Sequence, residues 1–168
     1  MGRRVIRNLK HFGPRILLYD PYVSDEEARE MGIELFRDLM ELCRLSHAVT
    51  LHTPAIPATE KLLGAKEFQA MPDDAVFVNT ARGMCIDEAA LIAELEKGRL
   101  FAFLDVSLPE PAAADSPLRR LPNVIYTSHI AGGADSKIGR QAVDDIEAFL
   151  NGKPPLMAVT AGMLDRIA

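Results

Sequence analysis

The chain has 168 residues, of which 48% are hydrophobic and 26% are charged. It can therefore form one domain with a sizeable core, and its composition excludes a disordered or fibrous protein. The formal net charge of −5 argues against a nucleic-acid-binding surface. No segment approaches the roughly 20 apolar residues that cross a membrane. Charges at Arg7 and Lys10 interrupt the apolar stretch near the N-terminus, so we expect no signal peptide.

The two cysteines, Cys43 and Cys85, stand far apart and have no second ligand at metal-binding spacing. We expect both to be small buried side chains, and we expect neither a disulfide framework nor a metal site. This cysteine usage predicts a cytoplasmic protein.

Short apolar runs alternate with amphipathic stretches, a pattern typical of a parallel sheet flanked by helices. Ser24, with Glu27 three residues later, matches a capping box, and Asp38 and Asp87 precede other helical stretches. In chain order the predicted elements are a helix over 5–12, a strand over 16–19, a helix over 24–32, a short edge strand over 33–36, a helix over 38–45, a strand over 48–51, a short helix over 65–71, a strand over 75–78, a helix over 87–97, strands over 100–104 and 124–126, and a helix over 138–149.

The apolar strands are expected to be buried on both faces, as strands of parallel sheets usually are. In the last helix, apolar residues share one face at positions 138, 142, 146 and 149 before Asn151-Gly152 ends it. The residues that follow, 154–168, have no clear partner within the chain.

Polar residues follow the predicted strands. In a doubly wound α/β sheet, ligands bind beyond the carboxyl ends of the strands. The residues at these positions are Asp20, then His52-Thr53-Pro54, then Asn79-Thr80-Ala81-Arg82-Gly83, then Asp105 with Glu110 close behind, and finally Ser128-His129. Three carboxylates, one arginine and two histidines are thus expected along one edge, which predicts a ligand site there.

Taken singly, these residues have simpler interpretations. Asp20 before Pro21 is also typical of a turn. Arg82 is also typical of a solvent-exposed loop. Glu110 lies in a proline-rich loop, where exposed carboxylates are common. His129 is also compatible with a structural, hydrogen-bonded histidine. The hypothesis of a site therefore depends on the combination and its order along the chain.

Three blocks carry a family resemblance: 78–83, 104–106 with Glu110-Pro111, and 127–133. With them, the chain from Gly2 to about Pro155 resembles the D-isomer-specific 2-hydroxyacid dehydrogenase family. The resemblance implies an α/β fold with a doubly wound, mostly parallel, Rossmann-like sheet. It also implies NAD as cofactor and a small 2-hydroxy or 2-keto acid as substrate.

The resemblance further implies catalytic roles for Arg82, Glu110 and His129. It implies that Asp105 holds the nicotinamide carboxamide and that Asp20 binds the adenosine ribose, where a carboxylate favours NAD over NADP. The other cofactor contacts that it implies are Gly2, Pro21, His52, Thr53, Pro54, Thr80, Ala81, Ala131 and Gly132, together with Arg82 and His129.

Two positions depart from the family pattern. Ser107 stands where an aromatic residue is usual, and Ser128 stands where a proline is usual. Neither change removes a reacting group, but both are expected to loosen the loops that carry the site.

Gly2 matches the last glycine of the family's phosphate-binding loop. We therefore expect the chain to lack the first strand and the start of the glycine-rich loop, which would leave two strands with unpaired edges. We expect a truncated dinucleotide-binding domain over 1–153 and a C-terminal tail over 154–168 that would return to an absent substrate domain. Such a chain is not expected to turn over substrate alone.

The leading functional hypothesis is the NAD-binding domain of an oxidoreductase that transfers a hydride between NAD(H) and a small D-2-hydroxy or 2-keto acid. One alternative is an NAD-regulated interaction module resembling the C-terminal-binding-protein corepressors. Another is a non-catalytic remnant that only dimerises. The resemblance also implies a homodimer.

Overall fold

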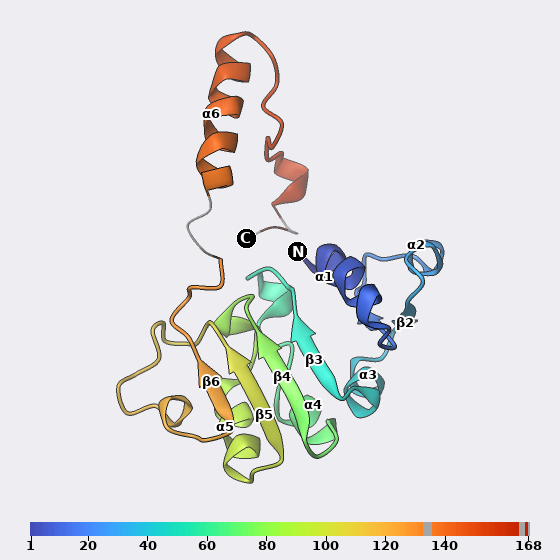
Figure 1. Ribbon diagram of the computed structural model, residues 1–168, viewed down its shortest axis with the longest axis vertical. Helices are drawn as coiled ribbons and strands as arrows, with labels where there is room; N and C mark the ends of the chain where they lie inside the picture. Colours follow the sequence, from blue (N-terminus) through green and yellow to red (C-terminus); the bar gives the residue numbers. More distant parts are fainter. Residues whose placement is uncertain (133–135, 165–166, 168) are drawn as a thin grey trace.

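The computed structural model describes residues 1–132, 136–164 and 167. Its strands form two parallel sheets (Figure 1). The smaller sheet pairs β1 (Leu17–Tyr19) with β2 (Glu34–Phe36). The larger sheet has the order β3 (Ala48–Leu51), β4 (Ala75–Asn79), β5 (Leu100–Leu104) and β6 (Val124–Tyr126). All neighbouring strands run parallel, which confirms the predicted α/β class.

Helices connect the strands: α1 (Gly2–Leu9), α2 (Asp25–Glu30), α3 (Leu39–Leu45), α4 (Ala65–Ala70), α5 (Glu88–Glu96) and α6 (Ser136–Leu150). The capping box at α2 is present: the Ser24 hydroxyl accepts from the Glu27 amide at 3.1 Å, and the Glu27 carboxylate accepts from the Ser24 amide at 3.0 Å. The Asp38 and Asp87 side chains accept hydrogen bonds from amides in the first turns of α3 and α5. Local capping therefore places these helix starts where the sequence predicts them.

The core lies between one face of the larger sheet and the helices α3, α4 and α5. Phe77 of β4 is fully buried and meets Phe68 of α4 edge-to-face, with ring centroids 5.2 Å apart. On the opposite face Phe101, Phe103 and Ile125 are 43%, 44% and 56% exposed. The expectation that these strands are buried on both faces is therefore wrong here, because α5 packs against the other face of β5 and no helix within the described residues covers this one.

The two sheets are separate because β1 and β3 do not pair with each other. Within the described residues β1 pairs only with β2, and β3 pairs only with β4. β1 and β3 therefore each have one unpaired edge. Figure 1 shows α1 beside β3. The unpaired edges of β1 and β3 agree with the two unpaired strand edges that the sequence predicts.

Helix α6 projects away from the sheets, and the chain after it folds back alongside (Figure 1). The Leu156 amide donates to Asp145 Oδ1 at 2.7 Å, which joins the tail to the helix. Ile138, Ile146 and Phe149 on the predicted apolar face are 67%, 59% and 71% exposed. The division into residues 1–153 and a tail over 154–168 stays a prediction. Among the described helices, none combines the length and the apolar character needed to span a bilayer.

Candidate active site

The candidate site lies at the carboxyl ends of β3, β4, β5 and β6. Their last residues are in register, since Leu51 pairs with Asn79, Asn79 with Leu104, and Leu104 with Tyr126. The loops that follow these strands therefore leave the sheet at the same level and lie next to one another.

The turn after β4 is shaped by Asn79, whose side chain is fully buried. Its Oδ1 accepts from the Ala81 amide at 3.0 Å, and its Nδ2 donates to the Arg82 carbonyl at 3.0 Å. The exposed Arg82 guanidinium donates to the Ala81 carbonyl at 2.7 Å. It forms no hydrogen bond or ion pair with the described side chains of Glu110 or His129. The turn thus leaves Arg82 available to a ligand.

Gly83 allows the turn after β4 to approach the loop after β5. A Cβ atom at this position would lie 2.2 Å from the Ser107 carbonyl oxygen and 2.4 Å from its carbon. No side chain fits in that space. The contact fixes the turn that carries Arg82 against the loop that carries Glu110.

Asp105 organises the segment after β6. Its carboxylate accepts from Thr127 Oγ1 at 2.5 Å and from the amides of Ile130 and Ala131 at 2.9 and 2.8 Å. Its carbonyl accepts from the His129 amide at 2.7 Å. Burial raises the pKa of the Asp105 carboxyl, but the hydrogen bonds from Thr127, Ala131 and Ile130 outweigh burial and hold that pKa below its ordinary value. Asp105 therefore acts as an ionised anchor.

His129 has a left-handed backbone with φ of 53°, which is rare for a residue other than glycine. The Asp105 hydrogen bonds hold it in this conformation, which brings its ring to the loop after β5. There His129 Nδ1 meets Glu110 Oε1 in a short contact. The two side chains are 48% and 34% exposed, so the pair is open to solvent. Because Nδ1 is engaged, Nε2 is the ring nitrogen left for a reacting group.

The loop after β5 is held at several points. Ser107 Oγ donates to the Pro109 carbonyl at 2.7 Å and lies 3.1 Å from the Tyr126 hydroxyl, which accepts from the Ala112 amide at 2.9 Å. Ser107 is only 2% exposed. The loosening expected from the serine at this position is thus not seen.

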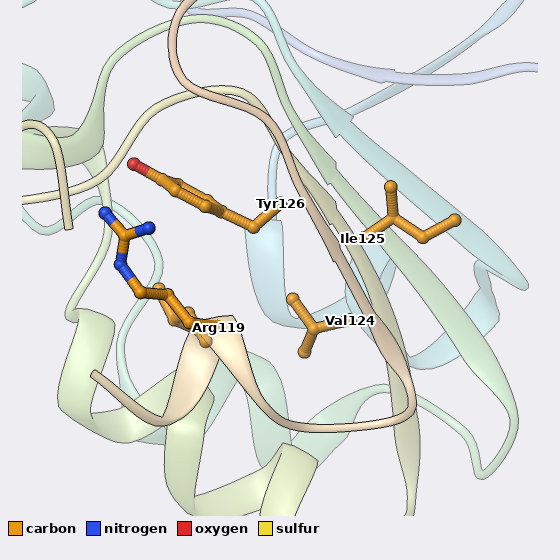
Figure 2. Close-up of a pocket in the computed structure, with 5 residues that line it drawn as sticks. Arg119, Val124, Ile125 and Tyr126 are labelled. Carbon is orange, nitrogen blue, oxygen red and sulfur yellow. The ribbon is translucent and has the colours of Figure 1, made fainter. Parts of the chain in front are cut away.

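A pocket beside this loop is lined by Leu118, Arg119, Val124, Ile125 and Tyr126 (Figure 2). The Arg119 guanidinium lies 5.5 Å from the centre of the Tyr126 ring. It also donates to the carbonyls of Ala112 and Ala113 at 2.7 and 3.0 Å. Arg119 therefore braces both the ring and the loop.

His52 and its neighbours form the part of the edge next to α1. A Cβ atom on Gly2 would lie 3.4 Å from His52 Cβ, so the start of α1 packs closely against this histidine. Burial, and secondarily the N-terminal charge, lowers the pKa of His52, which is consequently neutral at pH 7. The Thr53 hydroxyl is buried and has no hydrogen-bond partner among the described residues.

Asp20 lies at the end of β1. Its Oδ1 accepts from the Tyr22 amide at 2.9 Å, which is the turn that the Asp20-Pro21 pair also predicts. Only one carboxylate oxygen is used in this bond. Arg37, which comes well after Asp20 in the sequence, lies within 3.5 Å of the Asp20 carbonyl and pairs with Asp25 at 2.9 Å. The fold thus brings an arginine near Asp20 that its immediate sequence does not contain.

The remaining predicted contacts lie on the same edge. Thr80 is exposed, as are Ala131 and Gly132 after His129. The Pro54 carbonyl accepts from Thr59 Oγ1 at 2.5 Å and so shapes its own loop. The cofactor roles of all these residues stay predictions.

Comparison with known proteins places this edge in context. Residues 1–131 match the family described as D-isomer specific 2-hydroxyacid dehydrogenase, NAD binding domain. The chain belongs to this family.

Similar dehydrogenases and reductases are much longer than the chain. It is 41% identical over 149 residues to the D-3-phosphoglycerate dehydrogenase of Methanocaldococcus jannaschii, covering 88% of this chain and 28% of that protein. It is 38% identical to the glyoxylate/hydroxypyruvate reductase B of Escherichia coli, covering 91% and 49%. The chain therefore spans half the length of these relatives or less.

Solved structures agree in fold. The holo form of the D-mandelate dehydrogenase of Rhodotorula graminis superposes with a TM-score of 0.81 at 33% identity, covering 95% of this chain and 49% of that one. The D-lactate dehydrogenase of Lactobacillus jensenii, solved with NAD+, has a TM-score of 0.81 at 28% identity, covering 95% and 52%. The match confirms the Rossmann-like fold and the NAD-binding family.

The residues on this edge of the dehydrogenase domain fit a dinucleotide. The unpaired Thr53 hydroxyl is a buried polar group that lacks a partner in the described chain, and such groups normally have one. The second Asp20 oxygen can accept from ribose hydroxyls. The chain thus offers a free carboxylate oxygen and an unpaired hydroxyl that suit a dinucleotide.

Reasoning from the sequence named Asn79 and Thr127 without giving them a role, and it missed Tyr126. Asn79, Thr127 and Tyr126 all end strands or follow them directly, and each has a side chain that makes hydrogen bonds within the site. Polar residues at the last positions of apolar strands are the signal that could have found them.

Proposed function

We propose that this chain is the part of an NAD-dependent oxidoreductase that binds the cofactor and carries the catalytic residues Arg82, Glu110 and His129. The substrate class is a small D-2-hydroxy or 2-keto acid. The observation that carries this proposal is the Glu110–His129 contact at the edge of the sheet where Arg82 also lies.

His129 is the proton donor in the direction of reduction. An imidazolium has a pKa close to working pH, so it can protonate a carbonyl oxygen as that oxygen becomes an alkoxide. The contact with Glu110 through Nδ1 orients the ring, and Nε2 then faces the substrate. In the reverse direction the same nitrogen accepts the hydroxyl proton.

Arg82 binds the carboxylate of the substrate. A guanidinium offers parallel N–H groups that match a carboxylate in a two-point interaction, whereas a lysine offers a point charge. The turn made by Asn79 and Gly83 sets the position of Arg82 relative to the loop of Glu110. NAD, when bound, supplies or accepts the hydride. Asp20 and Thr53 are proposed to hold its adenosine side, and Asp105, Ala131 and Gly132 its nicotinamide side.

The cofactor part of this proposal is tested by calorimetry on the 168-residue chain. We expect titration with NADH to give a binding heat. Asp20→Ala should weaken binding about tenfold, since it removes a hydrogen bond to a charged acceptor. Asp25→Ala is the matched control, because it removes a nearby exposed carboxylate that pairs with Arg37.

A chain without measurable heat for NADH would contradict the proposal and leave the remnant hypothesis. Equal losses in the two variants would show that Asp20 has no specific part in binding. Binding without any turnover in an assembled enzyme would instead favour the NAD-regulated interaction module.

We also propose that the chain forms a homodimer in the cytoplasm. The support for self-association is the apolar face of α6, where Ile146 and Phe149 are 59% and 71% exposed. The two buried, unpaired cysteines support a reducing compartment. Sedimentation equilibrium should give twice the chain mass at tens of micromolar, and Phe149→Asp should shift the chain towards the monomer. A wild-type monomer at that concentration would contradict the dimer.

A further inference from the structure

The position of Glu110 depends on the backbone of its loop. Among the described residues, His129 is the one hydrogen-bond partner of the Glu110 carboxylate. The loop between β5 and the turn at Pro117–Arg119 contains no helix or strand. Whatever fixes the backbone on either side of Glu110 therefore decides whether its carboxylate reaches His129.

Two hydroxyl groups fix that backbone through hydrogen bonds whose directions can be assigned. The Ser107 hydroxyl has one proton, and it goes to the Pro109 carbonyl at 2.7 Å. In the 3.1 Å contact between Ser107 Oγ and the Tyr126 hydroxyl, the tyrosine must then be the donor. The tyrosine oxygen in turn accepts from the Ala112 amide at 2.9 Å. The chain of bonds runs in one direction from Ala112 to Pro109.

This chain of bonds joins the two sides of Glu110. Pro109 comes immediately before Glu110, and Ala112 comes two residues after it. Ser107 and Ala112 are 2% and 3% exposed, so water does not compete freely for these bonds. Arg119 holds the Tyr126 ring and the Ala112 carbonyl in the same place.

We propose that Tyr126 and Ser107 are positioning residues that close the loop around Glu110 and hold its carboxylate against His129. The proposal rests on the roles proposed above for Glu110 and His129. Neither hydroxyl touches the reacting atoms. Each acts through the backbone that carries the glutamate.

The test measures the His129–Glu110 contact directly in the 168-residue chain labelled with ¹⁵N-histidine. The Hδ1 proton of His129, assigned by its loss in His129→Gln, should exchange with water more slowly than that of a histidine without a carboxylate partner, and Glu110→Gln should remove that protection. Tyr126→Phe and Ser107→Ala should each raise the exchange rate at least about fivefold, the effect of losing one neutral hydrogen bond, because each variant removes two such bonds. The double variant should add little, because both changes break the same chain of bonds.

Ser46→Ala is the matched control. It removes another buried serine hydroxyl, which donates to the Leu42 carbonyl at 2.7 Å in α3, outside the site. It should lower stability and leave the His129 exchange rate unchanged. Exchange rates in Tyr126→Phe and Ser107→Ala equal to that of Ser46→Ala would reduce the pair to a structural role and overturn the proposal. So would a wild-type Hδ1 without protection.

If Tyr126→Phe does not fold, Ser107→Ala still tests the proposal, because it breaks the same chain of hydrogen bonds at Ser107. The readout needs no cofactor or substrate. Failure of the NADH titration therefore counts against the proposed function alone, and a protected wild-type Hδ1 that Tyr126→Phe and Ser107→Ala leave unchanged counts against the positioning role alone.

Discussion

His129→Gln is expected to lower kcat for NADH-dependent reduction of a 2-keto acid by about 10²- to 10⁴-fold, the usual contribution of a general acid. The glutamine amide is close to histidine in size and cannot deliver a proton at neutral pH. The KM for NADH should change by less than about twofold, because the loss falls on the chemical step and not on binding.

We propose to make this measurement in a chimera. The chain can replace the matching segment of the Escherichia coli glyoxylate/hydroxypyruvate reductase B, to which it is 38% identical over 160 residues. His47→Gln is the matched control, since His47 is exposed and lies at the opposite end of β3 from His52. Wild-type turnover in His129→Gln would refute the assigned proton donor. A chimera that binds NADH and shows no turnover would refute catalysis by these residues.

Asp105→Asn is expected to lower the free energy of unfolding by about 3 kcal/mol, because hydrogen bonds to a charged acceptor each contribute roughly 1.5 to 3 kcal/mol. The asparagine keeps the shape, but it replaces one acceptor oxygen with an NH2 group facing N–H donors. Urea unfolding of the chain monitors the loss. Asp115→Asn, at an exposed carboxylate, is the control and should change stability by less than about 0.5 kcal/mol.

The contribution of Asp105 to the free energy of unfolding should decrease at low pH. The folded pKa of Asp105 lies below its ordinary value, so folding favours the ionised form. The stabilisation is complete above the unfolded pKa of about 3.9 and is lost as pH falls through the folded pKa. The stability difference between wild type and Asp105→Asn should be constant from pH 7 to about 5 and shrink below about pH 4. A difference that grows on acidification would contradict this assignment.

The amino-acid sequence by itself determined the local elements. β3 begins and ends at the predicted residues, Ala48 and Leu51. The capping box of Ser24 and Glu27 formed as expected. These features depend on side-chain periodicity and on hydrogen bonds between residues a few positions apart. Both can be read directly from the sequence. The rule that ligands bind beyond strand ends also placed the candidate residues on one edge.

Only the tertiary structure decided which of those residues meet. His129 and Glu110 are 19 positions apart, and Ser107 and Tyr126 are also 19 apart. Their contacts follow from strand register and from the left-handed turn at His129, and no local pattern encodes either. The exposure of Phe101 and Phe103 was likewise beyond prediction, because burial of a sheet face depends on which helices lie against it. Periodicity says which side chains share a face, and long-range packing decides what that face contacts.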